Sequence, residues 1–160
     1  MHKVIGFHNP DEEYGFLSNW YLSDFMVDGI LFSSMEQYMM YKKAVLFSDI
    51  ETAKEILSIK EVGKIKALGR QVKNYDDVIW NGRRQVIIYQ GLLEKFHQNQ
   101  ELKERLLKTG DAILAECAVQ DKIWGIGLSM KDEQRFTISK WRGQNLLGFA
   151  LMEVREKLLT

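Results

Sequence analysis

Glu36 and Lys43 are the two residues whose types and spacing most suggest chemistry. They are seven positions apart, so on a helix they project from one face at a separation of about 10 Å, with Met40 between them. A simple core helix does not need an acid and an amine on either side of an apolar side chain, so the pair is a candidate for chemistry. The ordinary alternative is that Glu36 is part of a helix cap and Lys43 is a solvated charge.

Two tryptophans offer candidate flat surfaces for a planar ligand. Trp124 is followed by Gly125, and a glycine lets the backbone come close to a bound ring. Trp80 stands just ahead of the longest expected helix, and either indole could equally be a core residue.

Asp121 suits a catalytic carboxylate, or a residue that forms a turn or a cap. Asn145 suits a ligand-positioning amide or the cap of the last helix, whose open N-terminus could receive a phosphate.

Patterns for metal binding and for cofactor binding are missing from the sequence. The histidines His2, His8 and His97 do not have the spacing of a helical zinc pair, and there is no acidic calcium loop, Walker loop or dinucleotide fingerprint. The lone Cys117 rules out an internal disulfide, and we expect it to be a small core residue rather than a reactive thiol. We therefore expect a protein without a metal and without a cofactor.

The composition describes an ordinary globular chain. Of the 160 residues, 46% are hydrophobic and 28% are charged, and 22 basic residues balance 22 acidic ones. The zero net charge argues against a broad polybasic surface, although a small basic pocket is compatible with it. Charge appears at Lys3, and no apolar run approaches the length of a membrane span, so neither a signal peptide nor a membrane partner is expected. We expect a single domain, 1–160, in the cytoplasm.

Local signals define the elements that must position these side chains. The pair Asp28-Gly29 lies between two apolar runs, which predicts a β-hairpin. Three capping-box spacings follow in series and predict three consecutive helices; they are Ser34–Gln37 or Ser33–Glu36, then Ser48–Glu51, then Ser58–Glu61. Apolar residues at helical spacing predict the longest helix.

These signals together predict an α+β fold that is dominated by helices, with a small β-sheet or hairpin packed on them. Gly69 is expected just after the third helix, and Gly110 to end the fifth. Strands are expected near 3–7, 23–27, 30–33 and 112–119, and helices over 34–47, 48–58, 58–68, 83–98, 99–108 and 144–159.

An ordered set of short fragments resembles the YbiA-like family, also called NADAR for its proposed link to NAD and ADP-ribose. Each fragment is weak alone, but together they cover nearly the whole chain in the family's order. The fragments are Gly15–Trp20, Ser34–Lys43, Ala67–Arg70, Trp80, Leu92–Phe96, Leu114–Glu116, Asp121–Gly127, Gly143–Gly148 and Leu151–Arg155.

The resemblance implies an N-glycosidase that cleaves the bond between a ribosyl carbon and a nitrogen. Two substrate classes are associated with the family: early intermediates of riboflavin biosynthesis, and ADP-ribose attached to guanine in DNA. The implied catalytic residues are Glu36, Lys43 and Asp121. The residues expected to bind the nucleotide-like substrate are Asn19, Arg70, Trp80, Arg84, Glu116, Trp124, Gly125, Gly143 and Asn145.

Two departures from the family pattern affect the expected substrate contacts. Gln37 stands where many members have histidine, and the segment 128–142 is longer and more charged than the minimal pattern.

Two rival hypotheses belong to other functional classes. A non-catalytic ADP-ribose or nucleotide-binding module leaves Glu36 and Lys43 without a role, and a purely structural helical domain does not explain the two tryptophans.

Overall fold

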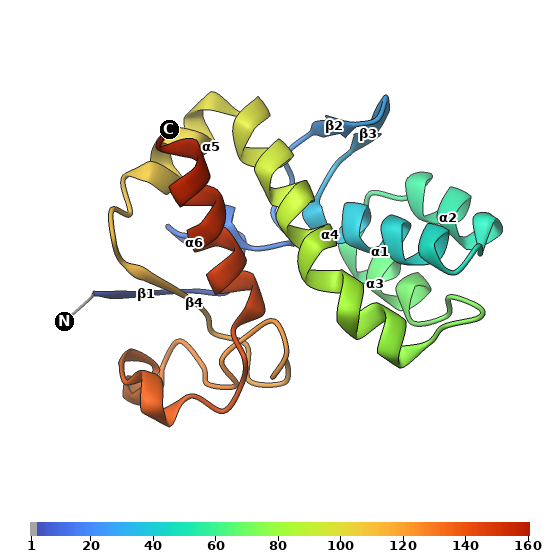
Figure 1. Ribbon diagram of the computed structural model, residues 1–160. Helices are drawn as coiled ribbons and strands as arrows, with labels where there is room; N and C mark the ends of the chain where they lie inside the picture. The colour runs from blue at the N-terminus through green and yellow to red at the C-terminus, as the bar shows by residue number, and fades with distance from the viewer. Residues whose placement is uncertain (1–2) are drawn as a thin grey trace. The chain divides into compact units, whose positions relative to one another are not determined.

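The computed structural model describes residues 3–160, which form two compact units. The first unit contains the chain up to Tyr21 together with Gln100–Thr160, and the second is Leu22–Asn99. Each has one two-stranded sheet among its described residues (Figure 1). No helix within 3–160 is both long enough and apolar enough to cross a bilayer. Met1 and His2, on which the expected absence of a signal peptide partly rests, lie outside the described residues.

The first unit is built on a parallel pair of strands, β1 (Val4–Phe7) and β4 (Ile113–Glu116), in which Val4 lies beside Ile113 and Phe7 beside Glu116. Apolar residues of both strands face a core that also contains the segment after β4. Helix α6 packs on β4 (Figure 1). The other elements are η1 (Gly15–Leu17), α5 (Gln100–Leu107), η2 (Glu133–Phe136), η3 (Ile138–Lys140) and α6 (Leu146–Leu158).

The second unit begins with the predicted hairpin, in which β2 (Phe25–Val27) pairs antiparallel with β3 (Ile30–Phe32). Asp28 and Gly29 have φ angles of 51° and 80°, the left-handed values that a tight two-residue hairpin turn requires, so this prediction is confirmed. Helix α1 contacts each of the other three helices of the unit. The four helices are α1 (Met35–Leu46), α2 (Ile50–Leu57), α3 (Val62–Gly69) and α4 (Asp77–Gln98).

Only the first of the three expected capping boxes forms. Ser34 caps α1 by accepting a hydrogen bond from the Gln37 amide, at 3.1 Å. Ser48 was expected to cap α2 but has φ of 60°, so the chain turns there and Asp49 accepts from the Thr52 amide instead. Ser58 is the last residue of the turn that ends α2, and α3 begins without a side-chain cap. Serine followed by glutamate is therefore too weak a signal to locate a helix start in this chain.

Helix α4 begins at Asp77, six residues before the expected start. Asp76 caps it by accepting from the Ile79 amide, at 3.0 Å. The apolar residues of the first two turns do not lie on one buried face, since Val78 and Ile79 are exposed and Trp80 is buried. Helical periodicity therefore does not mark this start. As a consequence Trp80 lies within the helix rather than ahead of it.

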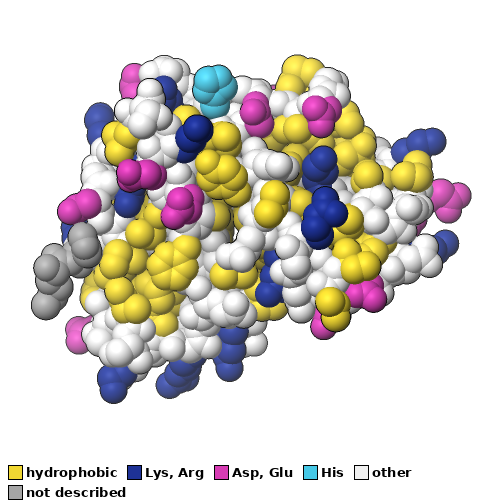
Figure 2. Space-filling model, viewed as in Figure 1, with side chains coloured by type: hydrophobic (Ala, Val, Ile, Leu, Met, Phe, Trp, Pro, Cys, Tyr) yellow, Lys and Arg dark blue, Asp and Glu magenta, His cyan; other side chains and the backbone are white. Residues whose placement is uncertain are grey.

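The helix-dominated α+β class is confirmed by these elements, and the single domain over 1–160 stays a prediction. Basic and acidic side chains are interspersed on the face that Figure 2 shows, so no broad basic field covers that face. This agrees with the balanced charge of the sequence.

Candidate functional site

The ammonium group of Lys43 is the centre of a polar cluster in the second unit. Its Nζ donates a hydrogen bond to the carbonyl oxygen of Gly69, at 2.7 Å. The same atom lies 4.7 Å from the centroid of the Tyr75 ring and 5.7 Å from that of the Trp80 ring. The end of α3, the segment before α4 and the first turn of α4 thus all meet the side chain of one α1 residue.

A close crossing of α1 and α3 brings the Gly69 carbonyl within reach. A Cβ atom on Gly69 would overlap the side chain of Met40, so any larger residue here would have to displace Met40 from the helix crossing. Gly69 was expected just after α3 but is its last residue. Met40 lies between Glu36 and Lys43 on α1, as the helical spacing predicted, and is 7% exposed. The apolar side chain that separates the two ionisable groups also sets the helix crossing.

Burial and charge act in opposite directions on Lys43. Burial is the largest effect and lowers the pKa of Lys43 below that of a free lysine, and the nearby Arg70 guanidinium adds to this. The Glu36 carboxylate raises the pKa of Lys43, but less than burial lowers it. Glu36, Lys43 and Arg70 are therefore electrostatic neighbours, and the free amine is more populated than in an ordinary lysine.

Glu36 is buried in the first turn of α1, with 5% of its surface exposed. The side-chain cap of α1 is supplied by Ser34, which accepts from the Gln37 amide. Gln37 also accepts from the Ser33 amide at 2.7 Å and donates to the carbonyl of Ile59 at 2.9 Å, which ties α1 to the end of α2. The role of Glu36 stays a prediction, and Gln37, the departure from the family pattern, has a structural role.

Tyr75 is the residue of this cluster that sequence reasoning missed. Its ring faces Lys43 and is 42% exposed, whereas Trp80 is only 7% exposed. Burial and a hydrogen bond to Asp77 raise the pKa of Tyr75 to about 12, so the hydroxyl keeps its proton at neutral pH. Arg84, one turn beyond Trp80, is close enough to oppose that shift, and its guanidinium donates to Asn81 at 2.7 Å. Of the two rings beside Lys43, Tyr75 is therefore the more exposed.

Tyr75→Ala is expected to weaken roughly tenfold or more the binding of any ligand that stacks on this ring, because stacking on an aromatic ring contributes about 1–3 kcal/mol. ADP-ribose, named by the family resemblance, is the probe. Isothermal titration calorimetry measures the affinity. Tyr75→Phe keeps the ring and removes only the hydrogen bond to Asp77, so it is the matched control and should bind normally. Equal affinities in all three proteins would remove Tyr75 from the binding surface.

Glu116 is a buried acid of the first unit, as Glu36 is of the second. Its Oε1 lies 3.2 Å from Nδ1 of His8, while its Oε2 is buried and has no hydrogen-bond partner among residues 3–160. Burial raises the pKa of Glu116, and the hydrogen bond to Glu116 raises that of His8. Sequence reasoning considered His8 only as a metal ligand. The pairing of Phe7 with Glu116 is what places His8 beside the carboxylate, and no local pattern reveals that pairing.

Asn145 uses its side chain to extend the sheet. Its Oδ1 accepts from the Glu116 amide at 3.0 Å, and its Nδ2 donates to the Leu114 carbonyl at 2.9 Å, as a neighbouring strand would do. The residue is fully buried and stands at the N-cap position of α6, as expected, but its side chain makes no capping bond to the helix. Its φ of 53° lies in the left-handed region, which asparagine tolerates better than most residues. A ligand-positioning role for this amide stays a prediction.

Asn145→Ala is expected to lower the free energy of unfolding by about 2–4 kcal/mol, because two buried backbone groups of β4 would lose their partners. Urea denaturation followed by circular dichroism measures it. The neighbouring Gln144 is exposed, so Gln144→Ala should change stability by less than about 0.5 kcal/mol. Equal stability of the two variants would contradict the strand-like role of Asn145.

The N-terminus of α6 is closed, not open as expected. The amides of Asn145, Leu146 and Leu147 donate to the carbonyls of Gly125, Ile123 and Trp124, at 3.0, 3.1 and 3.2 Å. These first amides are therefore not available to a phosphate, and the expected phosphate site at this terminus is wrong. This crossing explains two glycines: a Cβ on Gly143 would strike the Gly125 carbonyl, and one on Gly125 would lie 2.9 Å from the Asp121 carbonyl.

Asp121 has a defined structural task in the same loop. Its Oδ1 accepts from the amides of Ile123 and Trp124, at 3.0 and 2.9 Å, which is the turn alternative. Its charge raises the pKa of Glu116, so the two carboxylates are near each other.

Trp124 is half-buried. Asn19 is 7% exposed, and its Oδ1 lacks a hydrogen-bond partner within the described chain. The catalytic role of Asp121 and the binding roles of Asn19 and Trp124 stay predictions.

The predicted site residues therefore form two groups, one in each unit. Within 3–160, no three His, Cys, Asp or Glu side chains gather in a way that could hold a metal ion. The group of the second unit contains Glu36, Lys43, Arg70, Trp80 and Arg84, to which the structure adds Tyr75. In the first unit the described contacts join Glu116, Asp121, Trp124, Gly125, Gly143 and Asn145, to which the structure adds His8, and Asn19 belongs to the same unit.

Comparison with known proteins identifies the family. The NADAR domain matches residues 6–159. The chain belongs to the NADAR family. It is similar to an N-glycosidase of Acanthamoeba polyphaga mimivirus, with 39% identity over 97% of this chain and 96% of the relative. It is also similar to the N-glycosidase YbiA of Escherichia coli, with 29% identity over 97% of this chain and 88% of the relative.

A third relative and a solved structure complete the comparison. A riboflavin biosynthesis protein of Vibrio vulnificus is 32% identical over 99% of this chain, which spans 39% of that longer protein. The NMR structure of E. coli YbiA matches with a TM-score of 0.82 at 29% identity, over 99% of this chain and 87% of YbiA. The expected enzyme class, an N-glycosidase, is thereby confirmed, and this result disfavours the two non-catalytic alternatives.

Proposed function

We propose that this NADAR enzyme hydrolyses the N-glycosidic bond between an ADP-ribosyl or phosphoribosyl group and a nitrogen heterocycle, with Lys43 and Glu36 at the reacting carbon. The observation that supports this most directly is the position of the Lys43 amine. It is half-buried, held by the Gly69 carbonyl, bordered by the Tyr75 ring and close to the Glu36 carboxylate. A solvated surface lysine needs none of these neighbours.

The proposed reaction uses the free amine of Lys43 as the nucleophile. Its lone pair forms a bond to C1′ of the ribosyl group while the bond from C1′ to the base nitrogen breaks, and the base leaves with that electron pair and takes up a proton. The attached Nζ then loses a proton and the ring opens at O4′, which gives an imine. Water adds to the imine carbon and releases the free sugar and the lysine.

Glu36 acts at the same carbon as the group that balances charge. Positive charge develops on the ribosyl carbon as the base leaves, and a nearby carboxylate stabilises it or takes a proton from the attacking water. Arg70 is exposed and lies near Lys43, while Arg84 lies near Tyr75, so these guanidinium groups suit the phosphate or diphosphate of the substrate. No step of this scheme needs a metal or a redox cofactor.

The two substrate classes share this chemistry, and a direct comparison tests the proposal. ADP-ribosylated guanine in DNA and the phosphoribosylamino-pyrimidine of riboflavin biosynthesis are offered to one preparation, and release of the base is followed by chromatography. We expect turnover of at least one, and strong loss of that turnover in Glu36→Gln. The Vibrio vulnificus relative favours the pyrimidine as the first substrate to test. Binding of ADP-ribose without turnover of either compound would favour the nucleotide-binding module instead.

A further inference from the structure

The outer edge of β1 has unpaired backbone groups. The carbonyls of Lys3 and Phe7 accept from the amides of Ile113 and Cys117, both at 2.8 Å, so alternate residues of β1 face β4. In a parallel ladder the intervening residues, Val4 and Gly6, turn their amides and carbonyls away from that partner. Within residues 3–160 no hydrogen bond reaches those outward groups.

The opposite edge of the same sheet is closed. The side chain of Asn145 pairs with the outward groups of Leu114 and Glu116 on β4, and the Ile126 amide donates to the Glu116 carbonyl at 2.8 Å. The fold therefore satisfies one edge with its own groups and leaves the other edge open. Open strand edges are templates for the addition of another strand.

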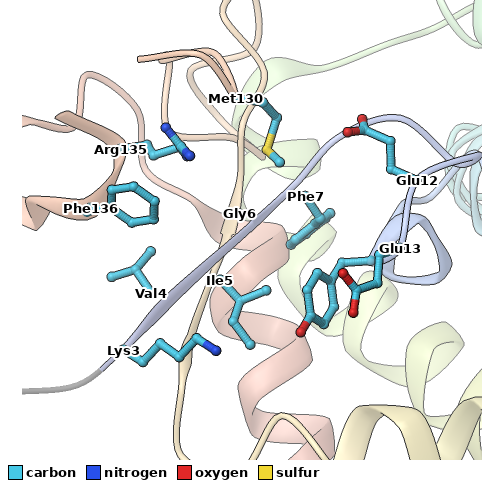
Figure 3. A pocket seen from close by; sticks show the side chains of 11 residues that line it. Lys3, Val4, Ile5, Gly6, Phe7, Glu12, Glu13, Met130, Arg135 and Phe136 are labelled. Atoms are coloured by element: carbon cyan, nitrogen blue, oxygen red, sulfur yellow. The ribbon is translucent and has the colours of Figure 1, made fainter. Parts of the chain in front are cut away.

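A pocket of about 300 Å³ follows this open edge, within the volume range of ligand sites. Figure 3 shows Met130, Arg135 and Phe136 on the side of β1 that Val4 and Gly6 face, and Ile5 and Glu13 on the other side. Glu12 stands near the Phe7 end and Lys3 at the opposite end.

We propose that this groove binds an extended peptide segment of a partner protein, which adds antiparallel to the outer edge of β1 and carries an acidic residue followed by a basic one. Antiparallel addition places one peptide residue opposite Gly6 and another opposite Val4, each exchanging two backbone hydrogen bonds. The residue between them lies opposite Ile5. This binding is independent of the glycosidase reaction proposed above.

The two walls of the groove select the side chains of the peptide. A residue opposite Gly6 projects toward the wall that carries Arg135, so an acidic side chain fits there. The space directly over Gly6 is filled by Cys117 and Met130, because an added Cβ would lie 2.9 Å from Cys117 Sγ and 3.1 Å from Met130 Sδ. The next residue projects to the other wall, which carries Glu13, so a basic side chain fits. The third lies opposite Val4 and near Phe136, whose ring is 51% exposed, so an apolar side chain fits.

The walls also argue for a bare peptide rather than a second copy of this chain. A second copy that approached through its own β1 would bring its own walls, formed by residues 12–14 and 130–136, into the space that the first copy's walls occupy. A single extended segment has no such walls and needs only the width of one strand, about 4.8 Å.

Amide NMR of the whole protein tests the proposal with the capped peptide acetyl-Ala-Glu-Lys-Val-Ala-amide. We expect saturable shifts at the Val4 and Gly6 amides and slower hydrogen exchange at both, with a Kd on the order of 10⁻⁴ M, as suits a contact far smaller than a standard interface. The same peptide with an N-methyl group on its glutamate cannot donate to Gly6 and should bind at least tenfold more weakly. The charge-reversed order Lys-Glu should also bind more weakly.

Variants of the wall residues separate recognition from folding. Arg135→Gln and Glu13→Gln each remove a charge from the groove and should weaken the peptide at least fivefold with an unchanged Tm. Asp11→Asn, an exposed charge that is not among the lining residues, is the matched control. Equal binding of the N-methylated peptide, absence of shifts at Val4 and Gly6 at millimolar peptide, or self-association that protects the same amides would each overturn the proposal.

Discussion

Lys43→Ala is expected to abolish turnover and to abolish covalent trapping of the substrate. The proposed imine between Nζ and C1′ is reduced by borohydride to a stable secondary amine, so borohydride added during turnover should leave a ribosyl adduct on Lys43. Mass spectrometry of the digested protein locates the adduct. Removing the nucleophile of a covalent mechanism costs several orders of magnitude in rate, larger than the loss of a single acid–base group.

Lys42→Ala is the matched control for this experiment. Adjacent helical residues point about 100° apart, so Lys42 cannot share the face of Glu36. Its Nζ instead lies 5.9 Å from the centroid of the Tyr38 ring. The variant should keep both turnover and trapping. An active wild-type enzyme that never traps would make Lys43 an electrostatic group and favour direct attack by water, and full activity in Lys43→Ala would remove it from the site.

The pH dependence of the rate follows from the same pKa shift. Because burial lowers the pKa of Lys43, the free amine becomes populated at a lower pH than in an ordinary lysine, and kcat/KM should rise with pH and level off above the lowered pKa. In stability terms the unfolded chain binds more protons at this residue, so the contribution of Lys43 to the free energy of unfolding increases as pH rises.

Arg70→Gln removes a charge that lowers the pKa of Lys43, so the rise in kcat/KM should move to higher pH even where the rate itself falls.

Short-range patterns predicted the parts of the fold that depend on neighbouring residues. The hairpin at Asp28-Gly29 and the cap at Ser34 are decided by side chains within four positions, and both are confirmed. The spacing of Glu36 and Lys43 is likewise a property of one helix, and the electrostatic influence of Glu36 on Lys43 agrees with it. Local chemistry was therefore sufficient for the first helix and for the acid–amine pair on it.

Features that depend on distant segments were not predictable in the same way. The parallel pairing of β1 with β4 joins residues 109 positions apart, and it alone brings His8 to Glu116. The competing caps at Ser48 and Asp49 differ by one position, and the choice depends on an additional hydrogen bond from the Lys73 amide to Asp49, at 2.9 Å. Tyr75 was missed because an aromatic residue in a short segment has no periodicity to mark it.

The closed N-terminus of α6 also depends on a distant segment, so local sequence does not reveal it. The sequence offers two interpretations of this helix start, a cap by Asn145 or an open terminus that receives a phosphate. The carbonyls that satisfy its first amides come from residues about 22 positions earlier, in the loop 121–127. The close contacts of Gly125 and Gly143 show that these glycines allow two backbone segments to cross, and their binding roles stay predictions.

Glu36→Gln is expected to lower turnover by a factor of ~10² or more, the range of a lost acid–base group. The change keeps the size of the side chain and its ability to accept hydrogen bonds through one oxygen. The cap of α1 is formed by Ser34 and Gln37, so it persists in the variant. Thermal unfolding should therefore change little, and steady-state release of the base measures the catalytic effect.

A second readout distinguishes chemistry at Glu36 from a merely structural role. The Glu36 charge raises the pKa of Lys43, so its removal should move the rise of kcat/KM to lower pH, in the direction opposite to that expected for Arg70→Gln. A structural defect would lower the rate without moving that midpoint. Glu36→Asp keeps the charge but withdraws the carboxylate by one methylene, so it should keep the midpoint near its original position while the rate falls. Unchanged turnover in Glu36→Gln would exclude Glu36 from catalysis and leave the buried carboxylate of Glu116, beside His8, as the next acid to test.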